Sequence, residues 1–476
     1  MKLYRARQRQ VGSDAYGLAR SYNERSTNQR AKRNRGVRQG MLWPETTRRD
    51  EHGGIEIGGI ALTSLAAEYG TPLYVFDEVT LRNRARRIVT AMRAAYPKTR
   101  VFYAGKAFLS PALLQILRSE GLSLDVVSGG ELYGGLLAGI PAAEITFHGN
   151  NKSVVELREA IDAGIGHIAV DNDLELDHLV ELTKNIGSKV PVLLRLNPGI
   201  DVHTHEKIKT GAIDSKFGFP LWTGDAERAA ARAVQIRGID LCGYHVHLGS
   251  QLFEPEAARL AVEMLFSFAN KIERTYGAST RMISTGGGFG IAYGEEYEES
   301  RFESWSKAIG AAALATAEKL GMEIPELTVE PGRYIVGPSA VSLYEVGSEK
   351  NIPGVRHYVS VDGGMSDNIR PSLYGAVYTA EVANRVAGPA TQTVTIAGKF
   401  CESGDVLIKD IAMPELRAGD LLAMPASGAY ALPMASNYNA ATRPAVVIVK
   451  AGKARVIKRR ETYADVFSAD VIETMD

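Results

Sequence analysis

Eight short apolar runs, separated by segments of helix length, are the feature that most constrains the fold of this 476-residue chain. We expect strands at residues 100–105, 122–128, 145–149, 167–171, 192–197, 241–247, 282–285 and 327–330. The intervening segments, for example 154–163 and 302–320, have the length and pattern of helices. Near-continuous apolar strands that alternate with helices are typical of a closed parallel barrel. The sequence therefore predicts an α/β fold, with a TIM-like (β/α)8 barrel over residues 77–338.

The sequence pattern changes after residue 338. Short β-branched runs with Gly and Pro turns follow, at 357–361, 392–396, 405–408, 420–424 and 445–449. They predict an all-β domain over 339–476, as a sandwich or small barrel. We expect the segment 41–76, with a strand at 55–60 and a helix at 63–69, to join this domain, and the run 73–77 to lead into the barrel. Two domains also suit the length, because single cores stop growing near ~250–300 residues.

The first 40 residues differ from the rest, with 11 Lys and Arg against Asp14 and Glu24. Their low apolar content predicts a disordered basic tail, either solvated or preceding a true start at Met41; a targeting role is less favoured. No apolar run approaches the ~18 residues of a membrane span, and nothing in the body indicates nucleic-acid binding. Two cysteines form no disulfide framework, which favours a reducing cytoplasm.

The ends of the predicted strands carry the candidate site, because barrels place their chemistry at the carboxyl ends of the strands. The residues there are Lys106, Asp125, His148, Asn150, Arg195, His247, Gly286, Gly287, Gly288 and Glu330. We count Asp125 among the cofactor-binding residues.

Lys106 ends the first of these strands, in Val101-Phe-Tyr-Ala-Gly-Lys106. An amine at the mouth of an apolar strand can be desolvated, which frees its lone pair for Schiff-base chemistry. This is the attachment that pyridoxal 5'-phosphate requires. A lone lysine would usually be a solvated surface residue, so the case depends on the motifs that follow.

Two later motifs supply groups for such a cofactor. The glycines of Gly286-Gly-Gly-Phe-Gly290 can wrap a phosphate, with Ser250 adding a hydroxyl, whereas Ile291 stands where a dinucleotide motif needs a small residue. Glu330 is placed to keep the pyridine nitrogen protonated, which makes the ring an electron sink. Arg333 can grip a phosphate or a carboxylate with two hydrogen bonds.

His245 and His247 lie two residues apart on one strand and leave a second interpretation open. Such a pair, with His203 and His205, is compatible with a barrel metallohydrolase. The neighbouring strand ends carry Lys106, glycines and Glu330 instead of further metal ligands. We therefore predict no metal, and expect His247 to stack on the cofactor ring.

The second domain adds further candidates. Cys401 beside Glu402 lies in a predicted turn, where a thiol can deliver a proton to a carbanion. Arg370, Tyr374 and Tyr430 contribute a guanidinium and two phenols.

Together and in this order, these motifs resemble the meso-diaminopimelate decarboxylases. The matching stretches are Tyr103-Ala-Gly-Lys-Ala107, Leu124-Asp-Val-Val-Ser-Gly-Gly-Glu-Leu132, Phe147-His-Gly-Asn-Asn-Lys-Ser153, Asp214-Ser-Lys-Phe-Gly218, His245-Val-His-Leu-Gly-Ser-Gln251, Gly286-Gly-Gly288, Glu330-Pro-Gly-Arg333, Cys401-Glu-Ser-Gly-Asp405 and Ser436-Asn-Tyr-Asn439. The resemblance spans residues 43–467, and Phe108 departs from it, since many relatives have Asn there.

The resemblance implies a fold-type III enzyme, similar to alanine racemase and ornithine decarboxylase, that uses pyridoxal 5'-phosphate. It assigns Lys106, Cys401 and His247 as catalytic, and Ser250, the three glycines, Glu330, Arg333 and Tyr430 as further cofactor contacts. Arg333, Arg370, Tyr374, Glu402 and Tyr430 match substrate contacts. A homodimer is also implied, in which Cys401 and Glu402 reach the partner's site.

The residue chemistry agrees with the substrate that the resemblance implies. Diaminopimelate offers a distal carboxylate to Arg333 and Arg370 and a distal ammonium to Glu402, whereas the cationic tail of ornithine or arginine would meet two guanidiniums. We therefore predict a carboxy-lyase that converts meso-2,6-diaminopimelate to L-lysine and carbon dioxide, the last step of lysine biosynthesis. An ornithine or arginine decarboxylase, a racemase and a non-catalytic relative that binds the cofactor remain the alternatives.

Overall fold

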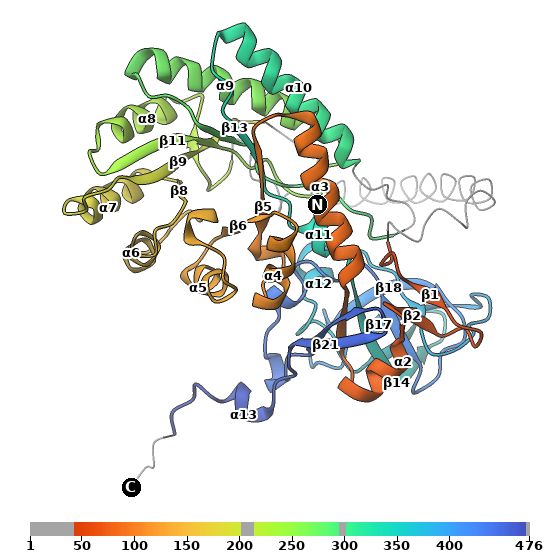
Figure 1. Ribbon diagram of the computed structural model, residues 1–476. Coiled ribbons are helices and arrows are strands. Elements are labelled where there is room, and N and C mark those ends of the chain that lie inside the picture. The colour runs from red at the N-terminus through yellow and green to blue at the C-terminus, as the bar shows by residue number, and fades with distance from the viewer. Residues whose placement is uncertain (1–41, 201–213, 295–300, 473–476) are drawn as a thin grey trace, which may run out of the picture. The chain divides into compact units, whose positions relative to one another are not determined.

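The computed structural model describes residues 42–200, 214–294 and 301–472, coloured along the chain in Figure 1. The predicted disordered tail and the pair His203 and His205 lie outside these residues.

All eight predicted barrel strands are confirmed. They are β5 (Thr99–Ala104), β6 (Ser123–Val126), β7 (Ile145–Phe147), β8 (His167–Val170), β9 (Val190–Asn197), β11 (Ile239–His245), β12 (Met282–Ser284) and β13 (Glu326–Val329). They pair in parallel in the order β9-β11-β12-β13-β5-β6-β7-β8, and a β8–β9 pairing closes the barrel. A short β10 (Phe219–Pro220) adds to β9. The carboxyl ends of all eight strands therefore meet at one end of the barrel.

Helices cover the outside of these strands (Figure 1). They are α3 (Glu78–Ala95), α4 (Pro111–Ser119), α5 (Gly129–Leu137), α6 (Val154–Asp162), α7 (Asp173–Thr183), α8 (Asp225–Gln235), α9 (Glu256–Tyr276) and α10 (Phe302–Leu320). Their sequences explain the arrangement. Helix α6 begins at a capping box between Ser153 and Glu156, and α9 buries Ala258, Val262 and Leu265, which share one face.

The second sheet has nine strands and is built around β14 (Ala340–Ile352). Its other strands are β4 (Leu73–Asp77), β15 (Arg356–Val361), β16 (Glu381–Val382), β17 (Gln392–Ala397), β18 (Val406–Met413), β19 (Leu421–Met424), β20 (Ala445–Lys450) and β21 (Lys453–Lys458). The C-terminal domain is thus a sheet domain, as predicted, and its described residues, 339–472, add the short helices α12 (Arg370–Tyr374) and α13 (Tyr463–Val466) and two single 3-10 turns.

Residues 73–77, the run expected to lead into the barrel, form a strand of the second sheet. Strand β4 runs antiparallel to β14 and parallel to β20, inside the second sheet. All five of its residues are buried, because strands flank it on both edges. Its last residue, Asp77, then accepts hydrogen bonds from the N–H groups of Val79 and Thr80, which starts α3. The chain thus passes to the barrel at this cap.

The single strand expected at 55–60 is instead a hairpin. Glycines at 58 and 59, both with positive φ, turn the chain between β2 (Ile55–Ile57) and β3 (Ile60–Ala61). With β1 (Arg48–Arg49) they form a separate three-stranded sheet, followed by α2 (Leu62–Tyr69). Apolar side chains of this segment, Ile57 and Leu65 among them, pack with Val75 and Val341 of the large sheet.

Within the described ranges, no helix combines the length and the apolar content that crossing a membrane requires.

Candidate active site

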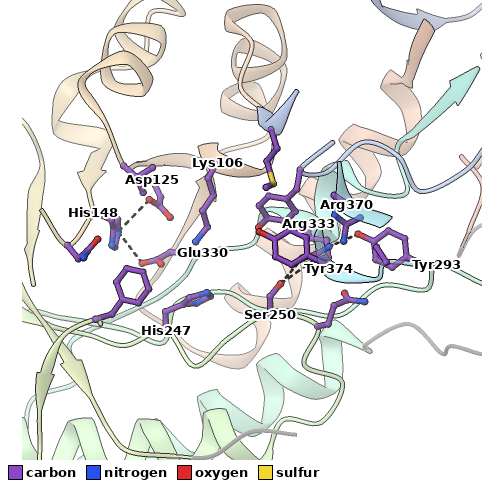
Figure 2. A pocket seen from close by; sticks show the side chains of 18 of the residues that line it. Lys106, Asp125, His148, His247, Ser250, Tyr293, Glu330, Arg333, Arg370 and Tyr374 are labelled. Atoms are coloured by element: carbon purple, nitrogen blue, oxygen red, sulfur yellow. Dashed lines mark hydrogen bonds and ion pairs between the residues drawn. The ribbon is translucent and has the colours of Figure 1, made fainter. Parts of the chain in front are cut away.

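A cavity of about 750 Å3 lies at the carboxyl ends of the barrel strands, and residues of the second sheet domain close one side of it (Figure 2). Lys106, His247 and Glu330 line it from the barrel, while Arg370 and Tyr430 line it from the sheet domain. The site that the sequence predicted at the strand ends is therefore one continuous space.

Lys106 projects into the middle of this cavity (Figure 2). It follows β5 in a single 3-10 turn, η1 (Gly105–Ala107). The N–H of Tyr430 donates to the carbonyl of Ala107 at 2.8 Å, so the sheet domain fixes this turn. Tyr430 itself has φ of +62°, a costly conformation for a tyrosine. Within the part of the chain that the structure describes, the Lys106 amine makes no hydrogen bond or ion pair, which leaves it available to a ligand.

Phe108, the departure from the related sequences, does not face the cavity. Its ring is fully buried and stacks on Phe76 with 5.0 Å between ring centroids. Its carbonyl accepts a hydrogen bond from the Tyr103 hydroxyl. The change to Phe therefore alters the packing behind the lysine turn and not the wall of the site.

Glu330 follows β13 and is held by two hydrogen bonds. Ser284 Oγ donates to Oε1 at 2.7 Å, and His245 Nε2 lies 3.0 Å from Oε2. Burial alone would raise the pKa of Glu330, but His245, His148 and these hydrogen bonds hold it well below its usual value. Glu330 is therefore an ionised, oriented carboxylate in a buried setting.

Asp125 and His148 lie beside Glu330 (Figure 2). His148 Nε2 is 3.7 Å from Asp125 Oδ1 and 3.6 Å from Glu330 Oε1. Burial and the nearby Glu330 raise the pKa of Asp125 well above its usual value, and burial lowers the pKa of His148 well below its own. Asp125 Oδ1 and His148 Nε2 are buried and have no hydrogen-bond partner among the described residues. Such orphaned polar atoms are rare in native interiors and mark a place for a polar ligand.

His247 presents a neutral ring to the cavity. Burial, with Lys106 and Arg195 nearby, lowers the pKa of His247 well below its usual value. Its Nδ1 accepts the N–H of Gly287 at 3.2 Å, which leaves the proton on Nε2. A neutral imidazole held flat in this way can stack on an aromatic ligand.

The three glycines lie where no side chain fits. A Cβ at Gly286 would come within 2.4 Å of the Val246 carbonyl, and one at Gly287 within 2.1 Å of the Glu330 carbonyl. Gly288 has φ of +108°, and a Cβ there would come within 2.4 Å of the Gly249 carbonyl. The N–H groups of Gly286 and Gly287 donate to Ser284 and His247, so in this structure the turn orders those side chains.

The opposite end of the cavity is cationic (Figure 2). Arg333 and Arg370 are 7% and 5% exposed, and neither makes an ion pair within the described ranges. Arg333 donates to Ser250 Oγ at 3.0 and 3.3 Å and lies over the Tyr430 ring at 4.6 Å. Burying a guanidinium without an anion costs several kcal/mol. This end of the cavity therefore fits an anionic ligand group.

The remaining predicted residues divide into two groups. Tyr374 and Ser250 line the cavity with the arginines. Cys401 and Glu402 do not line it; both are exposed in a turn, where the Cys401 N–H donates to Asn439 Oδ1.

Three residues that could ligate a metal ion also lie here, and they differ from the His245–His247 pair of the alternative interpretation. His148, His245 and Glu330 place one ligand atom each within 4.8 Å of one another. His245 and Glu330 hydrogen-bond to each other, and His247 lies outside the group. The two histidines thus orient the Glu330 carboxylate and keep it ionised.

The residues present fit pyridoxal phosphate. At one end of the cavity lie the available amine of Lys106, the ionised carboxylate of Glu330 and the neutral ring of His247. At the other end, Ser250 and Arg333 offer hydrogen-bond donors to a phosphate or a carboxylate. Arg195, which lines the wall 3.7 Å from Asp171, adds a further buried cation.

Sequence reasoning did not assign roles to several residues that the structure brings together. His148 and Arg195 lie at the ends of predicted strands, and this position could have identified them as residues of the site. Ser284 and Tyr293, by contrast, carried no motif, and only the folded geometry reveals their contacts with Glu330 and Arg333.

A parallel barrel with this lysine, carboxylate and histidine defines a pyridoxal phosphate-dependent enzyme of the barrel class. Residues 82–337 match the family described as "Pyridoxal-dependent decarboxylase, pyridoxal binding domain". The chain belongs to the pyridoxal-dependent decarboxylases, and within them to the diaminopimelate decarboxylase family.

Three relatives illustrate the similarity. The diaminopimelate decarboxylase of Bacillus subtilis is 49% identical over 90% of this chain and 98% of its own. That of Synechocystis is 43% identical over 90% of this chain and 93% of its own. The crystal structure of diaminopimelate decarboxylase from M. jannaschii in complex with L-lysine has a TM-score of 0.85 at 33% identity, covering 91% of this chain and 99% of that one.

Proposed function

We propose that this enzyme decarboxylates meso-2,6-diaminopimelate to L-lysine and carbon dioxide, with pyridoxal phosphate bound at Lys106. The observation that carries the proposal is the buried pair Arg333 and Arg370, which has no carboxylate partner among the described residues. A substrate with a second, unreacted carboxylate supplies that partner. Ornithine and arginine do not, because their far ends are cationic.

Each residue at the lysine end has a role in this reaction. Lys106 would hold the coenzyme through its aldehyde, and the neutral ring of His247 would support the face of the coenzyme ring. The chemistry that the coenzyme would supply when bound is an acceptor for the electron pair left behind as carbon dioxide departs. Glu330 holds a proton at the pyridine nitrogen, and Ser284 and His245 keep its carboxylate oriented.

At the other end, Arg333 and Arg370 hold the distal carboxylate, which fixes the direction in which the substrate lies. This orientation brings the carboxylate to be lost toward Lys106. Tyr374 and Tyr430 line the same end and bound the space around the substrate. A substrate that carries a distal carboxylate is therefore held by the guanidiniums with its reacting carbon in the correct place.

We also propose that two copies of the chain share their active sites. Cys401 and Glu402 match functional positions of the family, yet both lie in an exposed turn outside the cavity of their own chain. In a symmetric dimer this turn would enter the partner's site, where Cys401 Sγ would donate a proton to the carbon that has lost carbon dioxide, and Glu402 would pair with the distal ammonium.

The test is release of carbon dioxide from meso-diaminopimelate, ornithine and arginine by the protein loaded with coenzyme, with lysine assayed as product. We expect kcat/KM for diaminopimelate to exceed the others by about 1,000-fold or more, since unpaired buried polar groups reject the wrong substrate. Lys106→Ala should lose turnover and the visible absorbance of the bound coenzyme, whereas Lys184→Ala, on the exposed end of α7, should keep both. Preference for ornithine would overturn the proposal.

A further inference from the structure

Tyr293 contacts both arginines and belongs to none of the sequence motifs. Its hydroxyl accepts a hydrogen bond from Arg333 Nη1 at 2.5 Å, and the Arg370 guanidinium lies over its ring, 4.8 Å from the centroid. Figure 2 shows the phenol oxygen of Tyr293 turned toward both guanidiniums. The side chain is 7% exposed, so water does not replace these contacts.

The surrounding contacts hold the group in one arrangement. Tyr293 packs edge to face on Tyr378, with ring centroids 5.3 Å apart, and the Tyr378 hydroxyl accepts from Arg370. Arg333 is further fixed by Ser250 and by the ring of Tyr430. Each guanidinium thus has a phenol as its acceptor, and Tyr293 is the residue that contacts both.

Electrostatics explains why a phenol is needed there. Two like charges in a buried space repel each other and have lost their hydration. Although burial raises the pKa of Tyr293, Arg333 and Arg370 together bring it below its usual value, so the oxygen is a strong acceptor for both cations. A carboxylate in this position would neutralise an arginine outright and compete with a ligand, whereas a phenol aligns the guanidiniums and leaves their charge available.

We infer that Tyr293 is a positioning residue for substrate selection: it sets the spacing of Arg333 and Arg370 so that both grip the distal carboxylate of the substrate. This inference rests on the proposed function. Tyr293 makes no contact with Lys106 or Glu330 among the described hydrogen bonds, so its effect falls on binding of the carboxylate end and not on the bond that breaks.

The experiment compares inhibition of diaminopimelate decarboxylation by L-lysine and by cadaverine, using the coenzyme-loaded enzyme. Lysine retains the distal carboxylate and cadaverine lacks it, while the two chains are otherwise alike. For the wild type we expect lysine to bind at least about tenfold more tightly, because charge-assisted hydrogen bonds to a carboxylate are strong. Tyr293→Phe should reduce this preference by about tenfold, leaving cadaverine inhibition within about twofold.

The kinetic constants provide a second measurement. For Tyr293→Phe, KM for diaminopimelate should rise about tenfold while kcat changes by less than about threefold, the pattern of lost uniform binding. Tyr96→Phe is the matched control, since Tyr96 is a buried tyrosine that donates to the Pro325 carbonyl at the far end of the barrel. Its lysine preference should equal that of the wild type. If Tyr293→Phe does not fold, Tyr293→Gln, which keeps an acceptor oxygen, should lose part of the preference.

The outcomes separate the two proposals. A wild type that binds lysine and cadaverine equally would overturn the proposed role of the arginines, and with it the proposed function. A wild type that prefers lysine, with an unchanged preference in the Tyr293 variants, would overturn the role of Tyr293 alone. A fall in kcat with the preference intact would do the same.

Discussion

His245 Nε2 lies 3.0 Å from Glu330 Oε2, and both groups are buried in the wall of the cavity that Lys106 enters. This contact is one reason why the pKa of Glu330 stays well below its usual value despite burial. The carboxylate is therefore charged before any ligand arrives.

Replacing Glu330 by Gln should abolish most turnover while the coenzyme still binds. An amide cannot hold a proton at the pyridine nitrogen, so we expect kcat to fall by about 100-fold or more. Glu326→Gln is the control, because Glu326 begins the same strand and pairs with Arg100 at 2.6 Å, away from the cavity. Equal kcat values for the two variants would contradict the role of Glu330.

Arg370→Gln should lower kcat/KM for diaminopimelate by about 100-fold, since removing one partner of a buried charge contact costs roughly 2–5 kcal/mol. Arg281→Gln is the control: it removes an exposed arginine that pairs with Asp240 at the opposite end of the barrel, and should leave kcat/KM unchanged. A variant of Arg370 that works as well as this control would show that the distal carboxylate binds elsewhere.

Mixing two inactive variants tests the shared site. Lys106→Ala and Cys401→Ala should each be inactive alone, but random exchange of subunits restores one intact site in half of the dimers. About a quarter of wild-type activity should then return. No recovery after verified subunit exchange would mean that Cys401 works in the site of its own chain, and an active Cys401→Ala variant would mean that it has no essential role. Each variant mixed with itself provides the baseline.

Gly287→Ala should destabilise the site by steric conflict. The added Cβ would lie 2.1 Å from the Glu330 carbonyl oxygen, which is backbone and cannot move aside alone. We expect a loss of about 3 kcal/mol in the free energy of unfolding, measured in urea, and weaker coenzyme binding. Gly388→Ala, where nothing lies within 4 Å of the new atom, should leave both values unchanged.

Stability should fall on mild acidification, partly through His167. Burial lowers the pKa of His167 to about 4, with Arg100 and Arg281 adding to the effect. The unfolded chain binds this proton more readily, so between pH 7 and pH 5 the group costs about 1–2 kcal/mol of stability. His167→Gln should show a smaller loss over this interval, and exposed His52→Gln should match the wild type. A parallel pH dependence for both variants would contradict the assignment.

The barrel and the lysine end of the site could be predicted because local patterns determine them. Lys106 and Glu330 each follow a run of apolar residues, and parallel strands bring their carboxyl ends together. Leu73–Asp77 shows the limit of this reasoning. Five apolar or capping residues have the same local pattern in either sheet, so their place between β14 and β20 depends on contacts with residues far away in the sequence.

The arginine end was predicted only in part, for a related reason. Arg333 and Arg370 stood in recognisable motifs, but Tyr293 lies in an irregular stretch without periodicity, and its contacts exist only in the folded chain. Cys401 and Glu402 present a different limit. Their proposed site is on another copy of the chain, which neither one sequence nor one folded chain contains.

The position of β4 in the second sheet also determines when during synthesis that sheet can be completed. Residues 73–77 are made early during synthesis, yet one of their two hydrogen-bonding edges stays open until residues 445–450 emerge. An exposed edge strand of this kind invites wrong partners. A nascent chain therefore has an unpaired strand edge for most of its translation. A chain that ends before residue 445 would keep this edge and would be a target for chaperones and proteases rather than a smaller enzyme.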